Sequence, residues 1–217
     1  MLYEKLLQIK EDVLREAAVI ENILEKTVEA IYKKNTDYLN KVINDLEPDI
    51  DRTEIFIEEK CITLIALYQP EAKDLRTILM ILKMNRDLER IGDLIENIAE
   101  SGIYLAENCK NVNFKKVPDM AKITISMLKD SVDSFRNEDN TLATIVCRKD
   151  DEVDNMLADM FKEYLKEMYQ DPKVIEESMN LIRIAHNLER IADNSTNIAE
   201  ETVYMSTGKK INHQREF

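Results

Sequence analysis

Four carboxylates recur at helical spacing in the first half of the sequence. Glu89, Asp93, Glu96 and Glu100 fall within about 60° of one another on a helix that turns about 100° per residue, and Asn97 lies at the edge of this stripe. Clustered oxygen atoms are the ligands that cations such as Ca²⁺, Mg²⁺, Mn²⁺ or iron prefer. Because like charges on one narrow face destabilise a helix, the stripe predicts a bound cation.

The stripe belongs to a phrase that occurs twice, one hundred residues apart. Residues 88–100 read LERIGDLIENIAE and residues 188–200 read LERIADNSTNIAE, and nine of the thirteen positions are identical. At roughly 6% identity per position by chance, about one match is expected, so the chain is an internal duplication. In the second copy Thr196 stands where the first has Glu96, and the sites are therefore expected to differ. The remaining polar positions of the second copy are Glu189, Asp193, Asn197 and Glu200.

A second acidic pair, spaced i,i+4, also recurs near the middle of each half. Glu47 and Asp51 form it in the first half, and Asp150 and Asp154 form it in the second. If the helix that carries this pair lies antiparallel to the helix that carries the stripe, each half sets two acidic pairs face to face. The predicted metal ligands are Glu47, Asp51, Glu89, Asp93, Asp150, Asp154, Glu189 and Asp193, and the further candidates are Glu96, Asn97, Glu100, Asn197 and Glu200.

The alternative interpretation is an acidic face that is solvated or that binds a partner protein. Acidic residues occupy 43 of the 217 positions, so a single acidic pair at this spacing arises readily by chance. Arg90 and Arg190 could neutralise Asp93 and Asp193 across one helical turn. The recurrence of both pairs in both halves is what favours metal binding over this alternative.

The composition is typical of long helices. The chain has three Gly, four Pro and no Trp, with 44% hydrophobic and 34% charged residues. Its net charge of −13 repels nucleic-acid backbones and anionic lipid, so we expect neither as a partner. The sequence shows no signal peptide and no apolar run long enough to enter a membrane, which predicts a cytoplasmic protein. Three widely spaced cysteines without a CxxC motif indicate buried hydrophobic residues.

Apolar periodicity predicts three long helices in the first half. The first ends near residue 35, and Thr36 or Asp37 is the expected N-cap of the second. The second reaches about Tyr68, with a kink or a late start at Pro48. The third begins near Pro70 and fades near residue 108, and residues 108–118 form the linker to the second half.

The second half repeats this scheme. Helices are predicted over residues 120–135, then from residue 140 to about 170, and finally from Pro172 to about 207, where Gly208 ends the last helix. The expected fold is all-α, with two tandem, pseudo-symmetric three-helix bundles of long helices packed side by side. The predicted domains are residues 1–110 and 115–210, followed by a flexible tail at residues 211–217.

At these motifs the chain resembles the PhoU family of phosphate-uptake regulators. The doubled motif matches the family, as do Gln69-Pro70 and Asp74-Leu75-Arg76 upstream of it, the chain length and the six-helix duplication. The resemblance implies two three-helix bundles, and multinuclear iron or zinc clusters on E(D)xxxD motifs that fall here on the eight predicted ligands. The chain departs from the family at Leu94 and Asn194, where His is frequent, so a candidate nitrogen ligand is missing.

The resemblance also implies a regulatory role without enzymatic activity. Members of the family damp phosphate-starvation signalling and connect a phosphate ABC transporter to a sensor histidine kinase, which are therefore the expected partners; a homodimer or higher oligomer stays open. The enzymatic alternative, a carboxylate-bridged di-iron enzyme of ferritin type, needs Glu-x-x-His on two helices, and the sequence has no such motif. His186, three residues before Glu189, is expected to make an ordinary polar contact. The other alternative is a metal-free acidic docking protein.

Overall fold

The computed structural model of the chain describes residues 2–208, and the predicted tail at residues 211–217 lies outside them. The first bundle consists of α1 (Leu2–Lys33), α3 (Glu47–Tyr68) and α4 (Ala72–Asn108), with the short α2 (Thr36–Lys41) and a π-helical turn, η1 (Val42–Leu46), leading into α3. The second consists of α5 (Val117–Asn137), α6 (Asn140–Gln170) and α7 (Ile175–Thr207), with a 3₁₀ turn, η2 (Pro172–Val174), before α7. Residues 2–208 contain no strand, so the predicted all-α fold of two tandem three-helix bundles is confirmed.

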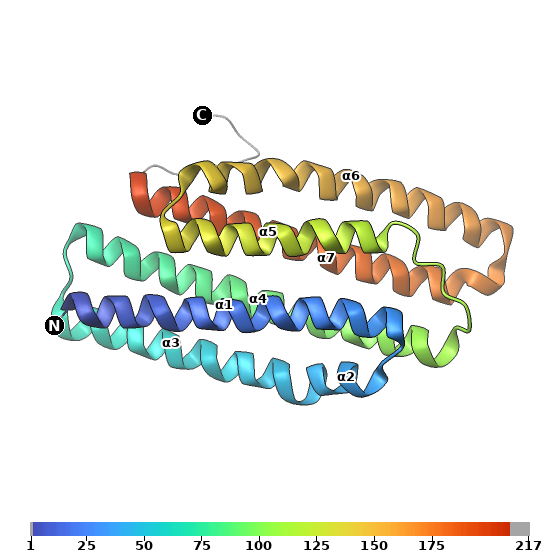
Figure 1. Cartoon of the computed structure of the whole chain (residues 1–217), viewed down its shortest axis with the longest axis horizontal. Coiled ribbons are helices and arrows are strands. Elements are labelled where there is room, and N and C mark those ends of the chain that lie inside the picture. The colour runs from blue at the N-terminus through green and yellow to red at the C-terminus, as the bar shows by residue number, and fades with distance from the viewer. Residues whose placement is uncertain (1, 209–217) are drawn as a thin grey trace.

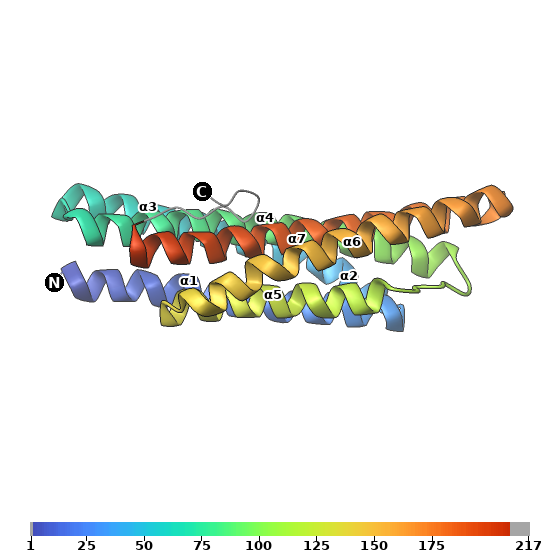
Figure 2. The same ribbon diagram turned by 90° about the horizontal axis from the view of Figure 1, so that it is seen from above.

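The two bundles lie side by side and join through α4 and α7, which run antiparallel (Figure 1). Seen from above, α1 and α5 lie on one side of the molecule and α4 and α7 lie on the other, while α3 and α6 flank them (Figure 2). Two ion pairs cross the α4–α7 contact: Lys83 Nζ lies 2.6 Å from Glu201 Oε1, and Arg183 Nη2 lies 3.6 Å from Glu100 Oε2. One continuous surface is therefore made by α3, α4, α7 and α6, in that order.

Equivalent side chains begin the second helix of each bundle. Asn35 Oδ1 accepts a hydrogen bond of 3.1 Å from Tyr38 N, and Asp139 Oδ1 accepts bonds of 2.9 and 3.1 Å from the backbone of Thr141 and Leu142. The prediction of Thr36 or Asp37 as the N-cap was wrong by one or two residues. The left-handed residue Lys34, with φ of 52°, ends α1 and leaves Asn35 as the last residue before the next helix.

The π-helical turn accommodates one extra residue in the first bundle. From the cap Asn35 to Glu47 there are twelve steps along the chain, whereas eleven separate the cap Asp139 from Asp150. A π turn inserts one residue into a helix without breaking it, and η1 lies directly before Glu47. Pro48 then falls in the first turn of α3, where its missing N–H costs no helical hydrogen bond. The predicted kink or late helix start at Pro48 thus corresponds to the π-helical turn η1, after which α3 begins at Glu47.

The apolar half of the repeated phrase builds both cores. Its members are fully buried in both copies, namely Leu88, Ile91, Ile98, Leu188, Ile191 and Ile198. Met80, Met84, Met120 and Met127 are buried as predicted, and so are Cys61 and Cys147, whereas Cys109 is only half-buried. Gly102 allows α4 to approach α1, since a Cβ at that position would lie 2.6 Å from Ile31 Cγ1. This close packing holds α3 and α6 in a fixed register against α4 and α7, and that register positions the acidic residues.

Candidate metal centres

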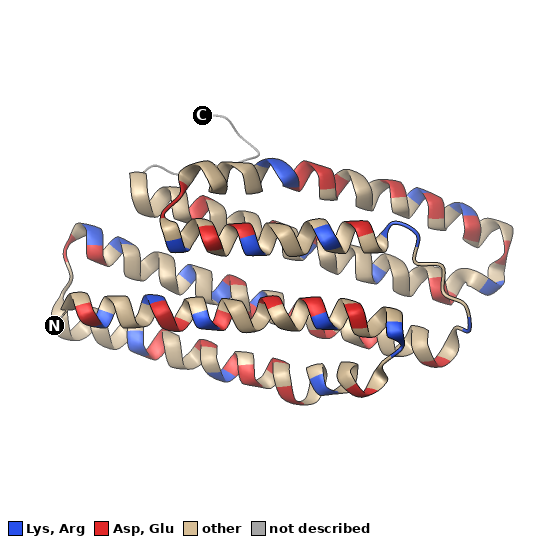
Figure 3. Cartoon of the chain, viewed as in Figure 1, with Lys and Arg blue, Asp and Glu red and all other residues tan. Residues whose placement is uncertain are grey.

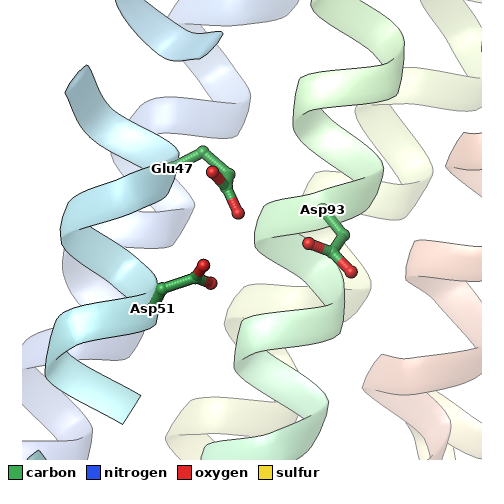
Figure 4. A group of neighbouring side chains, drawn as sticks. All are labelled: Glu47, Asp51 and Asp93. Atoms are coloured by element: carbon green, nitrogen blue, oxygen red, sulfur yellow. The ribbon is translucent and has the colours of Figure 1, made fainter. Parts of the chain in front are cut away.

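Three of the predicted ligands converge in the first bundle. One carboxylate oxygen from each of Glu47, Asp51 and Asp93 lies within 4.8 Å of the other two. Glu47 and Asp51 extend from one face of α3 toward α4, and Asp93 comes from the neighbouring turn of α4 (Figure 4). Asp51 and Asp93 are exposed, while Glu47 is half-buried. Three carboxylates gathered in this way could hold a metal ion.

The second bundle repeats this arrangement at the equivalent positions. One oxygen from each of Asp150, Asp154 and Asp193 lies within 4.8 Å of the other two. Asp150 is buried, with 3% of its surface exposed, whereas Asp154 and Asp193 are exposed. The two acidic trios therefore come from the same elements of each half, with α3 and α4 in the first and α6 and α7 in the second.

Glu89 and Glu189 lie outside the two trios but within their electrostatic field. Burial, followed by the charges of Asp93 and Asp51, raises the pKa of Glu89. Burial, followed by the charges of Asp193, Asp154 and Asp150, raises the pKa of Glu189 to about 7. Each glutamate thus stands one turn of helix from the α4 or α7 aspartate of its trio, close enough for the charges to repel one another.

Burial and the neighbouring negative charges act together on the carboxylates of the first trio. Burial is the largest cause that raises the pKa of Glu47 to about 7, and the charges of Asp51, Glu96 and Asp93 raise it further. Burial and the charge of Asp51 also raise the pKa of Asp93. A proton or a cation relieves this repulsion, and a cation relieves it for all the carboxylates at once. The donor set consists of oxygens alone, which fits hard and borderline cations.

The further candidates differ between the two halves. Glu96 belongs to the first acidic surface, because burial and then the charges of Glu100, Asp93 and Asp51 raise its pKa. Its counterpart Thr196 is fully buried, so the second trio has one acidic neighbour fewer. Glu100 is engaged in the ion pair to Arg183, and Asn97 donates from Nδ2 to the backbone oxygen of Asp93. Among the second-half candidates, Asn197 is exposed and Glu200 is half-buried.

The interpretation of the stripe as a solvated acidic face expected Arg90 to neutralise Asp93, but the structure shows a different ion pair. Arg90 forms its ion pair with Asp87, at 3.7 Å between Nη1 and Oδ1, and not with Asp93. Asp87 is a charged residue that sequence reasoning did not single out. It is 7% exposed, and burial raises its pKa to about 7. Asp87 lies on the side of α4 near Glu201 of α7, whose charge also raises its pKa. The sequence of α4 by itself does not show that α7 packs there.

Two other side chains considered from the sequence lie away from the trios. Leu94 is buried, and Asn194 is 9% exposed and donates from Nδ2 to the backbone oxygen of Arg190 at 2.7 Å. The positions where the family often has His therefore point into the bundles. His186 is exposed. No helix of residues 2–208 combines the length and apolar character needed to cross a membrane.

Comparison with protein families gives one match that occurs twice in the chain. The model described as PhoU domain matches residues 13–102 and residues 117–202. These two segments correspond to the two bundles. Together they cover most of the chain.

Named relatives match over nearly the whole length. The chain is 41% identical, over 98% of its length and 96% of the relative's, to the phosphate-specific transport system accessory protein PhoU homolog of Aquifex aeolicus. It is 31% identical to the protein of the same name from Deinococcus radiodurans, over 88% of this chain and 89% of that one.

Two solved structures share the fold. PhoU from Pseudomonas aeruginosa superimposes with a TM-score of 0.93 at 29% identity, covering 96% of this chain and all of that one. The phosphate transport system regulatory protein PhoU from Streptococcus pneumoniae gives a TM-score of 0.89 at 27% identity, covering 98% of this chain and all of that one.

Proposed function

We infer the function from one premise, that this chain belongs to the PhoU family. It acts as an accessory protein of a phosphate-specific transport system and regulates phosphate uptake. The observation that carries this proposal is the match of the family to both bundles, together with relatives named as accessory proteins that are matched almost from end to end. The proposed role is regulatory rather than enzymatic.

The two acidic trios are proposed to hold iron or zinc in clusters of more than one ion. Glu47, Asp51 and Asp93 would bind in the first bundle with Glu89 beside them, and the second-bundle ligands would be Asp150, Asp154, Asp193 and Glu189. Bound metal would neutralise the repelling carboxylates. Because each trio joins two helices, it would also fasten α3 to α4 and α6 to α7.

The proposed partners are a phosphate ABC transporter and a sensor histidine kinase, both engaged from the cytoplasm. Two bundles of one architecture give such a protein two similar surfaces, which suits a link between two partners. The competing proposal of a metal-free acidic docking protein rests on the exposure of four of the six trio residues. It predicts the same partners and differs only in metal content.

A reporter of phosphate starvation tests the regulatory proposal. Loss of the gene should raise reporter output in high phosphate, and the wild-type chain should restore repression. Asp51→Asn with Asp93→Asn tests whether the first trio contributes, with Asp49→Asn as the control because Asp49 is exposed and pairs with Arg52 in its own helix. Output that does not change on loss of the gene contradicts the regulatory role. Full repression by the Asp51→Asn, Asp93→Asn variant would contradict a regulatory role for the first metal site but not the regulatory role of the protein.

A further inference from the structure

The negative charge of the chain is concentrated in four of its helices. Helices α3, α4, α6 and α7 carry 26 acidic and 13 basic side chains, which accounts for the whole formal net charge of −13. The rest of the sequence carries 17 of each sign and is neutral overall. The inward sides of these helices are apolar, so most of the charge lies on the outer surface that the four helices form together. We call this surface the four-helix face. Figure 3, viewed with α1 and α5 in front, also shows acidic residues along α3 and α6.

Exposed apolar side chains lie on the four-helix face of the second bundle, toward the end where η2 joins α6 to α7. Phe161 and Leu165 follow Asp154 by seven and eleven residues on α6, and Ile175 and Met179 precede Glu189 and Asp193 by fourteen residues on α7. These spacings keep each side chain on the side of its helix that carries the acidic residue. The exposed fractions are 49% for Phe161, 39% for Leu165, 42% for Ile175 and 49% for Met179. These four residues are the α6–α7 patch.

The first bundle differs at one of the four equivalent positions. The counterparts of the α6–α7 patch are Glu58, Ile62, Leu75 and Leu79. Ile62 and Leu79 are also exposed, at 55% and 42%, but Glu58 replaces the aromatic ring with a charge. At these four positions only the second bundle carries an aromatic side chain, Phe161.

We propose that the α6–α7 patch, together with the acidic residues beside it, docks an amphipathic helix of a partner protein that carries lysine or arginine next to its apolar side chains. The apolar face of that helix packs against Phe161 of α6 and Met179 of α7. Its basic residues lie over the carboxylates of the four-helix face, which supply orientation and a faster association rate.

Charge selects this occupant over the two others that an exposed apolar surface could have. A second copy of the chain would bring another four-helix face of net charge −13, and an anionic membrane would bring like charge as well. A basic helix is attracted by the same field that repels both. The proposal goes beyond the phosphate-regulatory role and does not depend on it. The patch residues are not metal ligands, and without the eight proposed ligands the four helices still carry 18 acidic against 13 basic side chains.

The probe is a fluorescent helical peptide of about five turns with leucine on one face and lysine on the other. It is titrated with the purified full chain at about 0.15 M salt, and binding is measured by fluorescence anisotropy. Phe161→Ser with Met179→Ser should weaken binding about tenfold, because truncating central apolar anchors removes most of the affinity of such contacts. The matched control, Ile62→Ser with Leu79→Ser, should weaken binding less than about threefold. Glu58→Phe should strengthen it by creating a second anchor.

Two measurements keep the outcome clear if a variant is perturbed. Circular dichroism and metal content of both variants should equal those of the wild type, since all four side chains are exposed. A photoreactive group on the leucine face of the peptide should label wild-type segments that contain Phe161 or Met179. Equal loss of binding in the two double variants, labelling of α1 or α5, or self-association of the chain through the α6–α7 patch would overturn the proposal. Binding to vesicles of anionic lipid that the patch variant abolishes would overturn it as well.

Discussion

The first bundle has a polar layer in its core where the second bundle has an apolar one. Glu16 is 8% exposed and Asn85 is 2% exposed, and both contact the same turn of α3: Glu16 hydrogen-bonds Thr53, and Asn85 Nδ2 donates to the Glu54 backbone oxygen at 2.9 Å. Glu16 Oε1 and Asn85 Oδ1 accept no hydrogen bond from the described residues. The equivalent positions in the second bundle are Met120, Met156 and Ala185.

A second difference concerns an ion pair at equivalent positions in each half. Asp12 of α1 pairs with Lys60 of α3 at 2.6 Å, and the counterparts Lys116 and Glu163 pair at 3.0 Å with the signs reversed. The duplication has therefore kept the interaction while exchanging its charges. The interior and the pairings have diverged, whereas the positions of the acidic trios have not.

This contrast separates features that only hold the fold together from features that a common function preserves. A core layer or an ion pair can change in one half provided that its partners change too. Carboxylates held this close together repel one another: burial first, and then the charges of neighbouring carboxylates, raise the pKa of Glu47 in the first trio and of Glu189 beside the second. The proposed metal would explain why both halves retain them.

Placing an acid in the apolar layer of the second bundle should have the largest effect. Met120→Glu buries a carboxyl group among apolar neighbours, and we expect the free energy of unfolding to fall by about 3 kcal/mol or more at pH 7. Urea denaturation followed by circular dichroism measures it. A loss below about 1 kcal/mol would mean that the second core tolerates charge as the first does, and the contrast between the layers would be lost.

The reverse change should stabilise the first bundle in a pH-dependent way. Burial is the main cause that raises the pKa of Glu16 from its ordinary value of 4.5 to about 7, so the folded state binds this proton more tightly than the unfolded state. The contribution of Glu16 to stability is therefore fully present below about pH 4.5 and is lost as the pH rises toward 7.

We expect Glu16→Met to be more stable than the wild type at pH 8, with an advantage on the order of 2 kcal/mol that shrinks as the pH falls to 5. Urea unfolding of the wild type and the variant at several pH values provides the measurement. Glu16→Gln is the control, because it keeps the shape of the side chain without the titration. A difference in the free energy of unfolding between wild type and Glu16→Met that does not change with pH would show that burial does not raise the pKa of Glu16.

Removing Glu96 should make the first metal site resemble the second. Glu96→Thr takes away one of the carboxylates that surround the first trio, and we expect the affinity for a divalent cation there to fall about tenfold. Competition between the protein and a coloured chelator measures this affinity. Glu107→Thr, on the same helix but away from the trio, is the control. Equal affinities of wild type and Glu96→Thr would place Glu96 outside the site.

Deleting one residue from the π-helical turn should have the smallest effect. Removing the exposed Asn44 gives the first bundle the eleven-step spacing of the second, so η1 becomes ordinary α-helix and stability changes by less than about 1 kcal/mol. Deleting the exposed Ile145 from α6 is the matched control, because it rotates Asp150 by about 100° relative to the cap Asp139. Thermal unfolding and metal content compare the two. Equal damage from both deletions would contradict the one-residue insertion.

Helical periodicity and the repeated phrase were sufficient to predict the bundles and to bring six of the eight proposed ligands together. They succeeded because i,i+4 spacing on facing antiparallel helices largely determines which side chains can meet. The prediction missed the cap at Asn35, since Thr36 and Asp37 have equally suitable side chains and the turn at Lys34 decides between them.

Other features depend on how the helices face one another. Glu16 lies within an ordinary amphipathic pattern, and only its packing against Thr53 shows that it is buried. Asp87 is buried for the same reason, through its position near α7. The π-helical turn cannot be recognised from the local sequence. It becomes evident when the spacing from cap to trio is compared between the two halves.

The central claim is that both bundles hold metal on equivalent carboxylate trios, and elemental analysis of the protein purified without chelator tests it most directly. Asp51→Asn with Asp93→Asn should lose the metal of the first bundle, and Asp154→Asn with Asp193→Asn should lose that of the second. The combined variant should then contain none while keeping its helicity. Wild-type protein without stoichiometric metal, or a combined variant with undiminished metal, would contradict the claim.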